Sequence, residues 1–242
     1  MQESSTQAKD VLQKTIGEVV AADYRTAEIF ERHGIDFCCG GKIPIVEACK
    51  SKGIDPAALT SELESLQQEP VDRSQNYSSW TLSFLADYIV NTHHVYLKEN
   101  DEQIVAYARK IATVHGERHP EVVQIAAIFE KVATDMVAHL KEEEEISFPA
   151  LKRAEAAKTN GNHLDVNDRE TIRNSLVRLH RDHEEVGDAI HEIRRLANGF
   201  KIPDDVCNTF MLTYRKLDEF ENDLHKHVHL ENNILFLKAA EL

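Results

Sequence analysis

Apolar residues recur at helical spacing along four long stretches of the chain, with polar residues between them. The pattern predicts helices near residues 79–113, 120–157, 168–197 and 203–239. Asn167 and Glu170 have the spacing of a capping box at the start of the third helix. No stretch of the sequence alternates apolar and polar residues as a β-strand does. Four long helices with short connections predict an all-α protein built on an up-and-down four-helix bundle.

Shorter helical stretches precede this bundle. They lie near residues 9–32, 43–52 and 56–68, with turns at Gly34 and at Gly40-Gly41. Residues 70–78 are polar and rich in turn formers, which is typical of a linker. The sequence therefore predicts a small helical domain at 1–69, a linker at 70–78 and the bundle at 79–242.

A motif of His and Glu occurs twice in the predicted bundle. His139 and Glu143 in the first copy match His227 and Glu231 in the second at one constant offset, and an Ile and a Phe that follow match as well. The helix before each copy carries a candidate His, at positions 93 and 183. The duplication indicates two helical hairpins that present the same ligand-type residues.

Helical periodicity places these residues on the apolar faces of their helices. With about 100° per residue, Glu231 lies about 40° from His227, on the face of Phe220 and Leu224. Glu143 has the same relation to His139. The six side chains predicted to point into one bundle core are His93, His139, Glu143, His183, His227 and Glu231.

Six inward polar groups of this kind indicate a metal site. A buried carboxylate is costly without a counter-charge, and bundle proteins hold pairs of metal ions with carboxylates and imidazoles from four helices. Nitrogen and oxygen donors without a thiolate favour iron or manganese, and leave zinc and copper open. A single His on an apolar face is more often a hydrogen-bonded core residue, and a single Glu near a helix end is more often half-exposed. The duplication favours a dinuclear site over these alternatives.

The other histidines are given lesser roles. His180 lies about 60° from His183 and is the candidate for a residue that supports the ligands from outside. His225 and His229 fall on the polar face of the last helix. Surface or supporting positions are predicted for them and for His94 and His191, and no role is assigned to His33, His115, His119 and His163.

Charge and composition narrow the class of protein. The 242 residues include 28 Lys and Arg against 42 Asp and Glu, a formal net charge of −14. This excess argues against binding to nucleic acid or to an anionic membrane surface. The sequence shows neither an apolar run of ~20 residues nor a signal-peptide pattern at its start. Sparse cysteines do not suggest a secreted disulfide framework. We therefore expect a cytoplasmic protein, either a monomer or a homodimer.

Cys38 and Cys39 are adjacent, and a disulfide between neighbours would distort the peptide that joins them. Gly40-Gly41 leaves them sterically accessible and Lys42 would favour a thiolate, so the pair is interpreted as a reactive dithiol or a soft-metal contact. The alternative is two small buried residues in a tight turn. Cys49 and Cys207 fall within predicted helices and are assigned structural roles.

These motifs resemble a known family. The bundle resembles the hemerythrin-like domains, and almost the whole chain is similar to the bacterial repair-of-iron-centres (RIC) proteins of the YtfE/ScdA type. The resemblance is carried by Asp36-Phe-Cys38-Cys39-Gly-Gly-Lys42 and by the segments that begin at His93, His139, His183 and His227.

The resemblance implies a non-haem di-iron centre whose two ions share an oxo or hydroxo bridge. Its terminal ligands would be His93, His139, His183 and His227, with Glu143 and Glu231 as bridging carboxylates. It further implies repair of iron–sulfur clusters damaged by nitric oxide or peroxide, through donation of iron to the damaged proteins. Cys38 and Cys39 would then act in thiol chemistry or iron transfer.

Two departures separate the chain from the oxygen-carrying hemerythrins. Gly187 stands where the third helix of those proteins has a second His, and Asn232 where the last helix has an Asp. Fewer ligands leave open positions, which suits iron release or binding of nitric oxide better than oxygen carriage. Reduction of nitric oxide to N₂O, and sensing of iron, nitric oxide or oxygen, remain the alternative functions.

Overall fold

The computed structural model describes residues 11–66 and 75–242, and within these ranges it contains helices and no β-strand. The predicted all-α class is confirmed. Residues 70–74 of the predicted linker lie outside the described residues, as do the ends of the helices predicted near 9–32 and 56–68. The described chain divides into two compact units. One contains the residues up to Leu85 together with His225–Glu241, and the other contains Ala86–Leu224.

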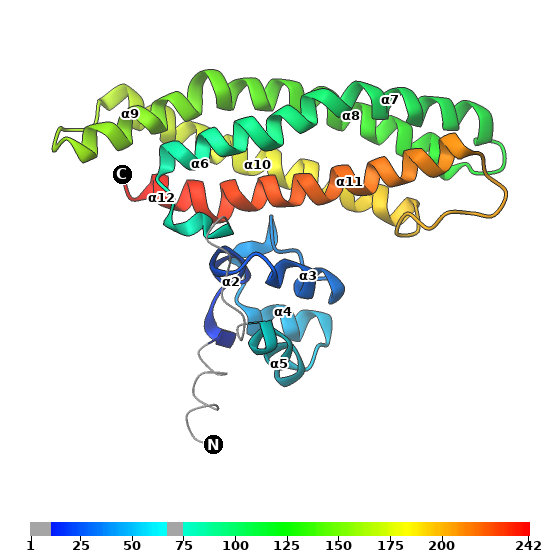
Figure 1. Cartoon of the computed structure of the whole chain (residues 1–242), viewed down its shortest axis with the longest axis horizontal. Coiled ribbons are helices and arrows are strands. Elements are labelled where there is room, and N and C mark those ends of the chain that lie inside the picture. The colour runs from blue at the N-terminus through cyan, green and yellow to red at the C-terminus, as the bar shows by residue number, and fades with distance from the viewer. Residues whose placement is uncertain (1–10, 67–74) are drawn as a thin grey trace. The chain divides into compact units, whose positions relative to one another are not determined.

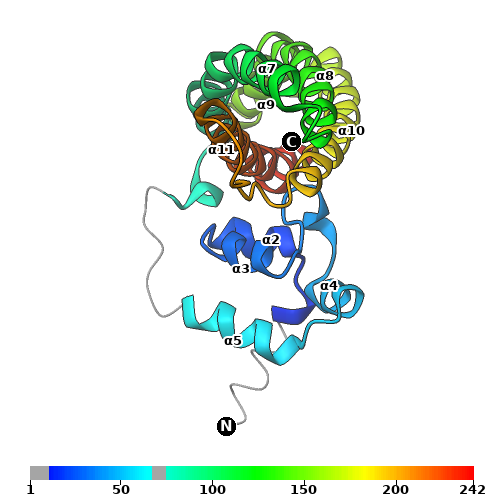
Figure 2. The same cartoon turned by 90° about the vertical axis from the view of Figure 1, so that its right-hand side faces the viewer.

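The second unit is the body of the predicted four-helix bundle. Its long helices are α7 (Val95–His115), α8 (Glu121–Glu142), α10 (Val166–Leu196) and the first part of α11 (Asn208–Leu230). α7, α8 and α10 run side by side, and the end-on view shows their packing around a common interior (Figures 1 and 2). Phe129 and Phe220 meet there edge to face, with ring centroids 4.9 Å apart. The predicted up-and-down bundle is confirmed.

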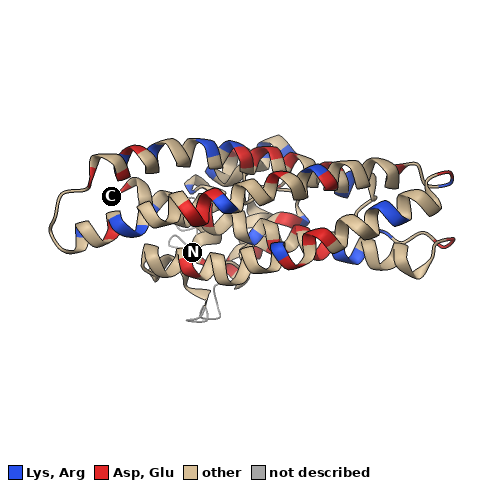
Figure 3. Cartoon of the chain, turned by 90° about the horizontal axis from the view of Figure 1, so that it is seen from above, with Lys and Arg blue, Asp and Glu red and all other residues tan. Residues whose placement is uncertain are grey.

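Asp and Glu positions are interspersed with Lys and Arg positions along the helices of the bundle (Figure 3). Some pairs link neighbouring helices. Arg109 of α7 pairs with Glu130 of α8, and Arg194 of α10 lies 2.7 Å from both Asp218 and Glu221 of α11. No helix in the described ranges combines the length and apolarity that a membrane span requires.

Three of the predicted long helices contain a π-helical segment of five residues each. These segments are η4 (Val90–His94), between α6 (Leu82–Ile89) and α7, η5 (Glu143–Ser147), between α8 and α9 (Phe148–Thr159), and η6 (Glu231–Leu235), between α11 and α12 (Phe236–Ala240). A π turn holds more residues than an α turn, so each segment rotates the residues after it around the helix. Such segments are frequent at functional sites.

The predicted capping box at Asn167 and Glu170 is wrong. α10 begins two residues earlier than the prediction near 168. The side chain of Asp165 accepts hydrogen bonds from the backbone N–H groups of Asn167, at 2.8 Å, and of Asp168, at 3.3 Å. An Asp at this position is a strong N-cap, and it leaves Asn167 inside the helix.

The first unit contains four short helices from the N-terminal part of the chain. They are α2 (Ile16–Ala22), α3 (Thr26–Arg32), α4 (Ile45–Lys52) and α5 (Pro56–Leu66). The single helix predicted near 9–32 is broken between α2 and α3, where Asp23 has an extended backbone and caps α2. Buried apolar side chains, among them Phe30, Phe37 and Leu59, form the core of these helices.

In the same unit, Asn233 of η6 anchors the loop that carries the cysteine pair. Its Nδ2 donates to the carbonyl oxygens of Phe37, at 3.1 Å, and Cys38, at 3.2 Å. Gly17 and Gly41 lie against its side-chain amide so closely that a Cβ on either glycine would overlap it. The glycines are needed here because only hydrogen atoms fit between these backbones and the buried amide.

We therefore expect Gly41→Ala to destabilise the fold by ~1–3 kcal/mol, because the new methyl group displaces Asn233 from its two carbonyl acceptors. Gly40→Ala is the matched control, since a Cβ there would meet Asp36 at an ordinary contact distance of 3.4 Å. Denaturant unfolding of both variants measures the effect. Equal stability of the two variants would contradict this account of the packing.

Candidate metal centre

The bundle unit holds three of the predicted ligands close together. His139 near the end of α8 and His183 in α10 point their rings toward each other, with the Nε2 atoms 3.1 Å apart. Glu143, one helical turn after His139, places an Oε2 3.4 Å from the same Nε2 of His139. Glu143 and His183 have no exposed surface, and His139 is 6% exposed. Nitrogen atoms that face each other at this distance inside a protein are arranged as ligands of a common ion would be.

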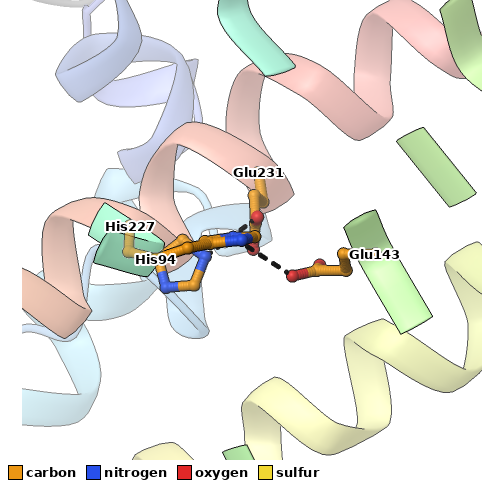
Figure 4. A group of neighbouring side chains, drawn as sticks. All are labelled: His94, Glu143, His227 and Glu231. Carbon is orange, nitrogen blue, oxygen red and sulfur yellow. Dashed lines mark hydrogen bonds and ion pairs between the residues drawn. The ribbon is translucent and has the colours of Figure 1, made fainter. Parts of the chain in front are cut away.

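His94 joins these residues from η4. Its Nε2 lies 3.4 Å from Oε2 of Glu143, as the dashed line between the two in Figure 4 shows. On the other side of the ring, Nδ1 donates to Glu144 at 2.8 Å, and Lys98 donates to the same carboxylate at 2.6 Å. Burial opposes the charge on Glu144, but the hydrogen bonds from Lys98 and His94 hold its pKa below the usual range. A His held by a carboxylate at one nitrogen, with the other directed inward, is typical of a metal ligand.

His93, the residue predicted for this position, lies elsewhere on the helix. It is buried, and its Nδ1 lies 2.9 Å from Asp223 of α11. The prediction assumed a straight α-helix from Leu82 onward. Because η4 is a π-helical segment, the positions after Ile89 are rotated, and the structure places His94 beside Glu143.

The other unit contains the second copy of the motif. His227 in the last turns of α11 and Glu231 at the start of η6 are four residues apart, with Nε2 2.9 Å from Oε1. Neither side chain has exposed surface. Figure 4 draws this pair with its dashed line, and both side chains leave the same face of the helix. The predicted inward orientation of His227 and Glu231 agrees with this burial.

Among the described residues, two groups of four buried His and Glu side chains have an arrangement able to hold a metal ion. One is His94, Glu143, His227 and Glu231, and the other is His139, Glu143, His183 and Glu231. Glu143 and Glu231 belong to both groups. The duplicated sequence motif therefore supplies the two members that the groups share.

The chemistry of these residues fits metal ions. A fully buried carboxylate costs several kcal/mol in an apolar surrounding unless a positive charge compensates it, and Glu143 and Glu231 are both fully buried. Imidazole and carboxylate donors without a thiolate suit iron or manganese. The buried carboxylates thus require a nearby positive charge, and the surrounding imidazoles and carboxylates are suitable ligands for a metal ion that supplies it.

Residues around these groups differ in part from the prediction. His180, predicted to support the ligands, lies outside both groups, with Nε2 3.7 Å from Glu184 on the same helix. Asp182, for which no role was predicted, lies 3.6 Å from Nδ1 of His139. The angular position of a residue around its own helix does not show which neighbour supports a ligand, because that depends on what the partner helix presents.

The prediction of a polar-face position is wrong for His229. This side chain is fully buried in the first unit, where the rings of Tyr24 and Phe37 each lie 5.7 Å from its own ring. Burial lowers the pKa of His229 to about 3, so the ring is neutral. Its Nδ1 lies 3.1 Å from Nδ2 of Asn233, the residue that holds the cysteine loop.

The cysteine pair is reduced in the structure, and the two sulfur atoms are 3.9 Å apart. Oδ1 of Asp36 accepts hydrogen bonds from the backbone N–H groups of Cys38 and Cys39, at 2.9 and 3.0 Å. These three residues form a third group able to hold a metal ion. The prediction that Lys42 favours a thiolate is wrong for Cys38: the hydrogen bond with Cys39, burial and the nearby Asp36 raise the pKa of its thiol.

A cavity of about 620 Å³ opens between α8 and α10. His139 lines it together with apolar side chains, including Ile128, Met136 and Val186, and with six charged side chains. Arg178 and Glu142 lie at the same opening. A small, weakly polar molecule can therefore approach His139 from this side of the bundle.

A helical bundle with buried His and Glu clusters of this kind defines a cation-binding protein of the hemerythrin class. The model for the hemerythrin HHE cation-binding domain matches residues 85–239, and the model for ScdA_N, a domain of unknown function (DUF542), matches residues 12–67. The chain belongs to the family of iron–sulfur cluster repair proteins that combine these two domains.

The relatives in this family cover nearly the full chain. The iron–sulfur cluster repair protein ScdA of Staphylococcus haemolyticus is 33% identical over 93% of this chain and 97% of the relative. The ScdA protein of Staphylococcus epidermidis is 31% identical over 91% and 96%. The iron–sulfur cluster repair protein YtfE of Yersinia pestis is 29% identical over 95% and 98%. The family resemblance found in the sequence is thus confirmed.

The geometry predicts different effects for the two adjacent histidines. His94→Ala should lower the metal bound per chain by roughly half, because His94 belongs to one of the two groups. His93→Ala should retain most of the metal, since His93 belongs to neither. Elemental analysis of protein purified without chelators measures both. Loss of metal in the His93 variant alone would show that the straight-helix prediction was right.

Proposed function

We propose that this protein repairs iron–sulfur clusters damaged by nitrosative or oxidative stress, and that it does so by donating iron. The observation that carries the proposal is the pair of fully buried carboxylates, Glu143 and Glu231, each shared by two groups of metal-ligand side chains. The names of the relatives supply the acceptor, because they are iron–sulfur cluster repair proteins.

In this proposal two iron ions are the cargo. Glu143 and Glu231 would hold both ions as shared carboxylate ligands, and the imidazoles of His139, His183, His227 and His94 would be the terminal ligands, with His94 in the place first given to His93. Glu144 and Asp223 hold His94 and His93 through their Nδ1 atoms. Iron rather than manganese is proposed because the relatives act on iron–sulfur clusters.

The ligand set favours release over permanent binding. Gly187 lies one turn after His183 on α10 and contributes no nitrogen where a second imidazole would strengthen the site. In the first unit, the residues directly after Glu231 are bound to the cysteine loop, since Asn233 donates to the carbonyls of Phe37 and Cys38. We propose that Cys38 and Cys39 accept the departing iron, with Asp36 as the third ligand.

The partners in this proposal are damaged iron–sulfur proteins in the cytoplasm, and the protein works as a monomer or homodimer. The net charge of −14 disfavours nucleic acid as a partner. Nitric oxide or oxygen would reach the metal ligands through the cavity beside His139. That cavity is also the observation in favour of a second candidate function, reduction of nitric oxide to N₂O.

The decisive variants are Glu143→Ala and Glu231→Ala. Each should reduce the rate at which a damaged [4Fe–4S] enzyme regains activity by ~10-fold or more, because each removes a ligand common to both metal groups. Glu145→Ala is the matched control, since Glu145 is exposed in the same run of glutamates and belongs to neither group. Wild-type repair rates in both bridging variants would refute the proposal.

Metal analysis and gas analysis together distinguish iron donation from reduction of nitric oxide. Metal-loaded wild type should contain about two iron ions per chain, and the double variant His139→Ala/Glu143→Ala should not. Single-turnover gas analysis after addition of nitric oxide to the reduced protein should yield no N₂O. Stoichiometric N₂O without repair of the damaged enzyme would replace iron donation by nitric oxide reduction.

A further inference from the structure

Cys207 and His115 form a contact at the end of the bundle where α7 turns into α8 and where α10 connects to α11 (Figure 1). They are 92 residues apart in sequence, and Nε2 of His115 lies 3.1 Å from Sγ of Cys207. His115 is about 30 Å along the helix from His94, given the rise of an α-helix, so the pair is remote from the candidate metal ligands of the bundle unit. The predicted helical position of Cys207 is wrong, because α11 begins one residue later, at Asn208.

Cys207 is exposed and stands immediately before α11. Its carbonyl accepts the backbone N–H of Met211 at 3.2 Å, so Cys207 is the N-cap residue of that helix. The backbone N–H groups of Phe210 and Thr209 in the first turn contribute to lowering the pKa of its thiol. A helix N-terminus stabilises a negative charge, and a thiolate in this position benefits from it.

The packing around His115 holds its ring beside this sulfur. The ring is 6% exposed and packs edge to face on Phe210, with the ring centroids 5.4 Å apart. Among the residues that the structure describes, its Nδ1 has no hydrogen-bond partner. Within those residues, the hydrogen bond of the imidazole is therefore the one with Cys207. No carboxylate among them accepts a hydrogen bond from its Nδ1.

The charged groups around the pair are already engaged with one another. His119 lies 3.1 Å from Glu121 and 3.2 Å from Asp205, and Arg118 lies 3.7 Å from Asp205. The hydrogen bond with His115, followed by those from the helix N-terminus, lowers the pKa of Cys207 to about 7. Burial instead raises the pKa of Cys49, and that of Cys38 is raised as well, so these two thiols stay protonated.

We propose that Cys207 and His115 are a thiolate–imidazolium pair and a site of covalent modification by low-molecular-weight disulfides. The Cys207 thiol gives its proton to Nε2 of His115, and the thiolate attacks one sulfur of the disulfide. A new sulfur–sulfur bond forms at Cys207 while the bond of the small disulfide breaks. The leaving thiolate takes the proton from His115, so one mixed disulfide and one free thiol are produced. This site is independent of the proposed iron donation.

The first test exposes the full-length protein to glutathione disulfide at neutral pH and locates the adducts by peptide mass spectrometry after quenching. We expect the mixed disulfide on Cys207 before it appears on Cys38, Cys39 or Cys49, and Cys207→Ser should abolish that early adduct. Early modification of another cysteine, with Cys207 unmodified, would overturn the proposal.

The second test addresses the positioning role of His115. The rate of Cys207 alkylation by iodoacetamide should rise with pH around a midpoint of about 7 in the wild type. In His115→Gln the midpoint should move toward the ~8.5 of an ordinary thiol. His163→Gln, at an exposed loop position, is the matched control and should keep the wild-type profile.

Circular dichroism verifies that the His115 variant is folded. Should it not fold, the wild-type profile still decides the question, because a midpoint at ~8.5 contradicts the pair in the native protein. An unchanged midpoint in a folded His115→Gln would likewise overturn the role of the imidazole.

Discussion

The burial of two carboxylates is the constraint on which the rest of this structure depends. Glu143 and Glu231 have no exposed surface, because each lies on the predominantly apolar face of its helix. A charge in that position is stable only beside compensating positive charge, and His residues alone supply it only when protonated. Metal ions satisfy the carboxylates at every pH at which the ligands stay deprotonated. The surrounding histidines are then the remaining candidate ligands, and the carboxylates that contact their outer nitrogens hold the rings in place.

Both carboxylates begin a π-helical segment, and a third such segment contains His94. Each segment gives up regular α-helical hydrogen bonding over five residues, a cost that a purely structural bundle has no reason to bear. At η6 the change of register has a second consequence within its unit. It presents Asn233 to the backbone carbonyls of Phe37 and Cys38, which links the residues after Glu231 to the cysteine loop through two hydrogen bonds.

The cysteines divide into two chemical kinds. Cys38 is buried, shares hydrogen bonds with Cys39 and Asp36, and keeps its proton unless a metal ion replaces it, which suits a ligand for iron in transit. Cys207 is exposed at a helix N-terminus beside a buried imidazole, which suits reaction with small electrophiles. Iron exchange and covalent modification of a thiol therefore belong to different regions of the chain, and variants at one need not disturb the other.

The sequence by itself determined the all-α class, the bundle and the inward direction of His139, Glu143, His183, His227 and Glu231. These depend on helical periodicity and on a duplicated motif, which are local properties of the chain. Only the tertiary structure placed His94 beside Glu143, because a π turn shifts the register without a signature in residue type. It alone buried His229, under Tyr24 and Phe37 from a distant segment, and it alone joined Cys207 to His115. Each of these contacts joins residues far apart in sequence, and periodicity along one helix contains no information about what packs against it.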